Sequence, residues 1–116
     1  MSCVYDCLIR EFRLRNTDPE KLLKILKKRN RLTKNVEWNH EPLSDADMQA
    51  NFERIQQIQD TDGYDCSSCD PVVLFLMAEL YNKVVVHDFN GSVVTYRNIN
   101  AKGGRIIIES DRHHMH

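Results

Sequence analysis

Apolar residues recur at helical spacing in four segments of the chain, and local start signals precede most of these segments. The pattern predicts helices over residues 2–14, 19–30, 44–59 and 72–81. The second and fourth follow an acid–proline pair, Asp18-Pro19 and Asp70-Pro71, and the third follows the capping residue Ser44. The fourth segment is apolar on nearly all sides, which predicts a central and deeply buried helix.

Short runs of β-branched residues follow the last predicted helix. Strands are predicted at 83–89, 92–97 and 105–110, and Asn90-Gly91 between the first two is a strong hairpin signal. The apolar run 106–108 predicts a strand buried on both faces. Helices first and strands last favour the α+β class, in which a small, mostly antiparallel sheet packs against the helices. One domain spanning residues 1–116 is expected.

The segment 32–42 shows no clear period, so a loop is expected there. It holds Trp38, the single tryptophan of the chain. A lone tryptophan in a loop of a small domain is expected to serve as a packing anchor. His40 is expected at the surface.

Composition and charge exclude several function classes. The 116 residues carry 16 basic and 17 acidic side chains, and this balance favours neither a nucleic acid nor a membrane partner. No apolar run is long enough to span a bilayer, and the charged residues soon after Met1 do not fit a secretion signal. We therefore expect a reducing, cytoplasmic setting. In that setting, four cysteines are more often thiols, a catalytic centre or metal ligands than disulfides.

Candidate chemistry lies at the two ends of the chain. Ser2 is a residue type that suits the N-cap position, which predicts Cys3 in the first helical turn, where the helix dipole favours a thiolate. His113, His114 and His116 follow the last predicted strand. An imidazole that takes the proton of a thiol makes it a nucleophile. A cysteine hydrolase is predicted if both ends meet at one edge of the sheet.

The first residues also resemble a known motif. Residues 2–8, Ser-Cys-Val-Tyr-Asp-Cys-Leu, resemble the nucleophile motif of the ovarian-tumour (OTU) cysteine proteases, which reads roughly Asp-Gly-Asn-Cys-Leu-Phe with an aliphatic residue three positions later. Residues 71–86 resemble the buried helix of that family and the strand after it, and Asn90-Gly91 matches its hairpin. The strand 106–108 followed by His114-Met115 is similar to the family's last strand and histidine.

The resemblance implies a fold, a reaction and roles for residues. It implies a papain-type fold in which Cys3 is the nucleophile and His114 the base, with His113 as the alternative base. The group that orients the imidazole stays open between Asp111, His116 and Asp6. The implied substrate is ubiquitin or a ubiquitin-like protein in isopeptide linkage, or a viral polyprotein in the host cytoplasm. No cofactor is implied, and a monomer is expected.

Two alternatives remain open. Cys3, Cys7, Cys66 and Cys69 form two pairs that suit a zinc site with four cysteine ligands. Cys7, however, stands on the apolar face of its helix, which predicts a small buried hydrophobe. The Asp-Gly that usually precedes the nucleophile motif is absent, which favours a catalytically degenerate domain that binds ubiquitin or another protein.

Overall fold

The computed structural model describes residues 3–59 and 71–110, with only the backbone of residues 3, 4 and 110. Within these ranges the chain is an α+β protein, as predicted. Its helices are α1 (Cys3–Glu11), α2 (Pro19–Lys28), α3 (Asp45–Gln57) and α4 (Pro71–Tyr81). Its strands are β1 (Val36–Trp38), β2 (Glu41–Pro42), β3 (Val84–Phe89), β4 (Ser92–Asn98) and β5 (Ile106–Ser110).

Capping residues set the limits of the outer helices. Asp18 accepts a hydrogen bond from the backbone N–H of Lys21 at 2.9 Å, and Ser44 Oγ accepts one from Asp47 at 3.1 Å. The first helix is shorter than predicted because Arg13 adopts a left-handed φ of 54°. No helix in the described ranges is long and apolar enough to cross a bilayer.

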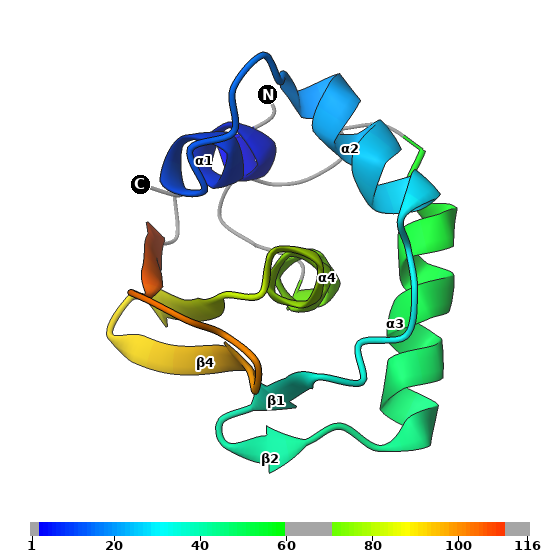
Figure 1. Cartoon of the computed structure of the whole chain (residues 1–116), viewed down its shortest axis with the longest axis vertical. Helices are drawn as coiled ribbons and strands as arrows, with labels where there is room; N and C mark the ends of the chain where they lie inside the picture. The colour runs from blue at the N-terminus through cyan, green and yellow to red at the C-terminus, as the bar shows by residue number, and fades with distance from the viewer. Residues whose placement is uncertain (1–2, 60–70, 111–116) are drawn as a thin grey trace.

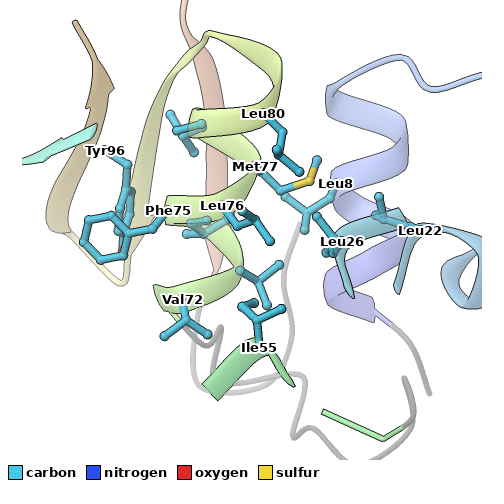
Figure 2. Packing of buried hydrophobic residues seen from close by; sticks show 14 of the residues in the cluster. Leu8, Leu22, Leu26, Ile55, Val72, Phe75, Leu76, Met77, Leu80 and Tyr96 are labelled. Atoms are coloured by element: carbon cyan, nitrogen blue, oxygen red, sulfur yellow. The ribbon is translucent and has the colours of Figure 1, made fainter. Parts of the chain in front are cut away.

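Helix α4 lies at the centre of the molecule (Figure 1), as its all-round apolar pattern predicts. It contacts α3 on one side and strands β1, β3 and β4 on another. Figure 2 shows Phe75 and Tyr96 on one side of α4, whereas Leu8 and Leu22 approach it from the opposite side. The core therefore surrounds a single helix.

The strands form one sheet in the order β2-β1-β4-β3-β5. The pairs β1–β2, β1–β4 and β3–β4 are antiparallel, and only β5 runs parallel to its neighbour β3. The prediction of a mostly antiparallel sheet is confirmed. The prediction of a loop at 32–42 is wrong, because this segment contains β1 and β2. The two strands are joined by Asn39 and His40, both at positive φ. His40 is exposed, as expected.

The prediction that 106–108 is buried on both faces is wrong. Ile108 is fully buried, but Ile107 is 56% exposed. Successive strand residues point to opposite faces of the sheet, and β5 lies at the sheet's edge. In the described structure α1 packs against β5 and α4 packs against β3 and β4, with the buried residues of these strands on their shared face.

A buried carboxylate joins α4 to the segment before β1. Glu79 is only 1% exposed, although it belongs to the most apolar helix. Its two carboxylate oxygens accept hydrogen bonds from the backbone N–H of Asn35 at 3.0 Å, from Asn35 Nδ2 at 3.1 Å and from Arg31 Nη2 at 2.9 Å. Buried charges persist in proteins when they are paired and hydrogen-bonded in this way.

Candidate functional site

The two elements that carry the predicted catalytic residues are neighbours. Helix α1 begins at Cys3, and β5 ends at Ser110, three residues before the histidine cluster. Helix α1 packs against β5, as Figure 1 shows for the dark blue helix and the red strand. These two elements are therefore neighbours, whereas the predicted meeting of Cys3 with the histidine cluster involves residues outside the described structure.

Most of the predicted site residues lie outside the described part of the structure. These are Asp111, His113, His114 and His116, together with Cys66 and Cys69 of the alternative zinc site. For Cys3 the structure places the backbone at the start of α1. Asp6, one turn later on the same helix, is exposed. The pairing of Cys3 with a histidine therefore stays a prediction.

The second cysteine of α1 is chemically different from a catalytic thiol. Cys7 is 2% exposed and belongs to the hydrophobic core, as its place on the apolar face predicts. Burial raises the pKa of its thiol to about 11, although Arg10, whose Nη2 donates to Cys7 Sγ at 3.6 Å, lowers that pKa in part. The thiolate is the form that attacks carbonyls and binds zinc. Cys7 suits neither role.

A further imidazole lies near this edge and was not predicted as a site residue from the sequence. His87 lies on the inner face of β3, where the sheet register places it between Val94 of β4 and Ile108 of β5. It is 7% exposed, and burial lowers the pKa of its imidazole. The negative charge of Asp88 raises that pKa in part, but burial has the larger effect. The signal was present in the sequence, because His87 follows Val85 at strand spacing and replaces an apolar residue at an inward position.

The burial of His87 predicts a specific pH dependence of stability. In the unfolded chain a histidine takes up a proton near pH 6.5, whereas folded His87 takes it up only at lower pH. The free energy of unfolding should therefore fall as the pH drops below 6.5, by at most about 1.4 kcal/mol per pH unit. Urea denaturation of wild type and His87→Gln between neutral and mildly acidic pH measures this slope. His40→Gln changes an exposed histidine and serves as the control.

The variant His87→Gln should lose this part of the slope, whereas His40→Gln should keep it. Equal slopes in wild type and His87→Gln would show that His87 is protonated as easily in the folded as in the unfolded state.

A groove of about 340 Å³ lies on the opposite side of α4 from α1. Trp38 lines it and is 47% exposed, and the prediction that Trp38 lies in a loop is wrong. Trp38 is instead the last residue of β1 and faces the space between the sheet and α3. The remaining lining residues come from α3, α4 and β4 and from the link between β2 and α3; they are Leu43, Asp47, Ala50, Asn51, Pro71, Phe75, Val94 and Tyr96.

No family model, no curated protein and no solved structure matches this chain. The function proposed below is therefore supported by the geometry of α1 and β5 and by the resemblance of short motifs.

Proposed function

We propose that this protein is a cysteine protease of the OTU type, with Cys3 as the nucleophile and His114 as the base. Its substrate would be an isopeptide bond to ubiquitin or a ubiquitin-like protein, or a peptide bond of a viral polyprotein. The observation that supports the proposal most is the packing of α1, which begins at Cys3, against β5, which ends four positions before His114 in the sequence.

The topology around α4 also supports this proposal. The chain runs from the buried helix α4 into β3, returns through the Asn90-Gly91 turn as β4, and then places β5 parallel to β3. In the register of this pair, Ser110 at the end of β5 lies opposite Phe89 at the end of β3. Strand β5 is thus an edge strand of the sheet, and α1 packs against it.

The two cysteines of α1 have different roles in this proposal. Cys3 is in the first helical turn, where unpaired backbone N–H groups and the helix dipole favour a thiolate. Cys7 is held as a neutral thiol in the core. In this proposal the first turn of α1 holds the reactive sulfur of Cys3, and the next turn places Cys7 in the hydrophobic core.

The reaction follows from these roles. The imidazole of His114 takes the proton of the Cys3 thiol, and the thiolate attacks the carbonyl carbon of the scissile bond. Backbone N–H groups beside Cys3 would stabilise the oxyanion. The imidazolium then gives its proton to the leaving amine, and water, activated by the same imidazole, hydrolyses the thioester. The bond to lysine is broken without any redox change.

The four-cysteine zinc site has weaker support. It requires Cys7 as a ligand, yet Cys7 lies among core residues with its pKa raised to about 11. A bound zinc ion would have to draw that sulfur, or all of α1, out of the core. No observation in the described structure favours that rearrangement.

The test is labelling with ubiquitin that carries a C-terminal electrophile, followed by peptide mapping of the adduct. An adduct on Cys3 is the expected result, and Cys7→Ala protein should be labelled to the same extent. No adduct in folded protein would contradict the deubiquitinase proposal. Measuring the zinc content of that sample would then separate a zinc module from a domain that only binds.

A further inference from the structure

Trp38, which lines the groove, belongs to a row of side chains that crosses three strands of the sheet. The sheet register pairs Trp38 with Glu41 of β2 on one side and with Tyr96 of β4 on the other. Directly paired residues of antiparallel strands point to the same face of the sheet. The carboxylate of Glu41 and the rings of Trp38 and Tyr96 therefore form one row across the sheet.

Helix α3 forms the facing wall of the groove. Asp47, Ala50 and Asn51 line the groove, and their spacing places them on one face of the helix. Ala50 contributes only a methyl group to this wall. Asp47 is exposed in the first turn of α3, so a second carboxylate stands across the groove from the sheet.

Two buried aromatic rings line the groove. Phe75 of α4 and Tyr96 are both buried, and their rings meet edge to face with centroids 4.8 Å apart. Trp38 stands above them with nearly half of its surface exposed to solvent. Well-packed rings below an exposed indole offer a preformed surface for an alkyl chain and a ring face for a cation.

The charges of the groove are all of one sign in the described structure. Asp47 is the only charged residue among those that line it, and Glu41 stands next to Trp38 in the cross-strand row, beside that lining. Within the described residues, neither Asp47 nor Glu41 forms an ion pair. By contrast, Glu37 on the other face of β1 is paired with Arg97 at 3.8 Å. The groove therefore favours a positively charged ligand.

We propose that this groove is a docking site for a lysine or arginine side chain on a polypeptide partner. The alkyl part of that side chain lies on Trp38 and Phe75, and its charged end lies between Glu41 and Asp47. The neighbouring apolar lining, which includes Leu43 and Val94, accommodates the residues that flank the cation in the partner. A polypeptide uses this whole surface, whereas a free amine would use only its acidic end.

This docking site does not depend on the proposed protease activity. Phe75 and Tyr96 lie on one side of α4 and Leu8 of α1 approaches the other (Figure 2), so the central helix separates the groove from Cys3. Binding can be measured without any turnover. A failure of the protease proposal would leave this inference untouched, and the reverse also holds.

The experiment uses Trp38 as its own reporter, because it is the only tryptophan in the chain. The fluorescence of the full chain is titrated with capped tripeptide amides of leucine–X–leucine, in which X is lysine, arginine, norleucine or glutamate. We expect a saturable change in the millimolar range with lysine and arginine. The norleucine peptide should bind roughly tenfold more weakly, since it keeps the alkyl chain but lacks the charge.

Matched variants separate the groove from the overall charge of the protein. Asp47→Asn and Glu41→Gln should each weaken lysine-peptide binding several-fold, and the effect should shrink at high salt. Asp45→Asn removes the same charge from the same turn of α3 but outside the groove, and Glu37→Gln removes one from the other face of β1. Both controls should bind like wild type.

Several outcomes would overturn the inference. Equal binding of the lysine and norleucine peptides would reduce the groove to an apolar surface. Equal weakening by Asp47→Asn and Asp45→Asn would assign the effect to overall charge. The absence of a saturable change with either cationic peptide would remove the docking site. Tight binding of lysine amide alone, with no gain from the flanking leucines, would point to a small amine and not to a polypeptide.

Discussion

Glu79→Ala is expected to lower the free energy of unfolding by about 3–4 kcal/mol. The substitution removes an ion pair with Arg31 and two hydrogen bonds from Asn35, and it leaves the backbone N–H of Asn35 without its acceptor. Arg31 is about half exposed and can be hydrated, which limits the loss. Because small domains have a total stability of about 5–15 kcal/mol, the variant would lose a large fraction of it.

Urea denaturation followed by circular dichroism measures this loss. Glu79→Gln is expected to lie between wild type and Glu79→Ala, because its amide keeps one acceptor but turns an NH2 group towards two donors. Glu53→Ala, an exposed helical glutamate, should change stability by less than about 0.5 kcal/mol. A loss for Glu79→Ala no larger than that of Glu53→Ala would show that the buried network contributes nothing net.

Elements with strong local signals could be predicted from the sequence. Proline at the first position of α2 and α4, and Ser44 before α3, fix helix starts through interactions within a few residues. The Asn90-Gly91 turn fixes β3 and β4 in the same way, with Asn90 and Gly91 both at positive φ. The periodic patterns between these signals were long enough to identify the elements.

Elements that depend on distant partners could not be predicted. Strand β1 has only three residues and is fixed by pairing with β4, which lies far along the chain. Its sequence has no local signal of sufficient length. The exposure of Ile107 depends on which face of the sheet the helices cover, and the apolar run itself does not carry that information.

The features of the candidate sites also differ in whether local sequence was enough to predict them. The apolar neighbours of Cys7 predicted its burial, because helical spacing alone puts it on the core face. The isolated glutamate in the apolar segment 72–80 was a sign of a paired buried carboxylate, but its partners Arg31 and Asn35 are known only from the fold. The groove was not predictable, because Trp38, Asp47 and Phe75 come from three separate elements.

The two cysteines of α1 give the sharpest test of the proposed chemistry. We expect Cys3→Ala to lower kcat/KM for a fluorogenic ubiquitin C-terminal amide by about 10⁴-fold or more, because loss of the nucleophile removes the covalent route. Its unfolding free energy should change little, since position 3 is the first residue of α1. Cys7→Ala should lose about 1–2 kcal/mol of stability, because it leaves a gap in a packed core.

The pair of variants is informative because each controls for the other. Both remove one sulfur from the same helix, so a general disturbance of α1 would affect turnover and stability in parallel. The proposal requires opposite responses: turnover lost with stability kept at position 3, and stability reduced with turnover kept, well below the melting temperature, at position 7. Unchanged turnover in Cys3→Ala would remove Cys3 as the nucleophile. Lost turnover in Cys7→Ala at an unchanged melting temperature would mean that a cysteine buried in this structure becomes exposed during the reaction.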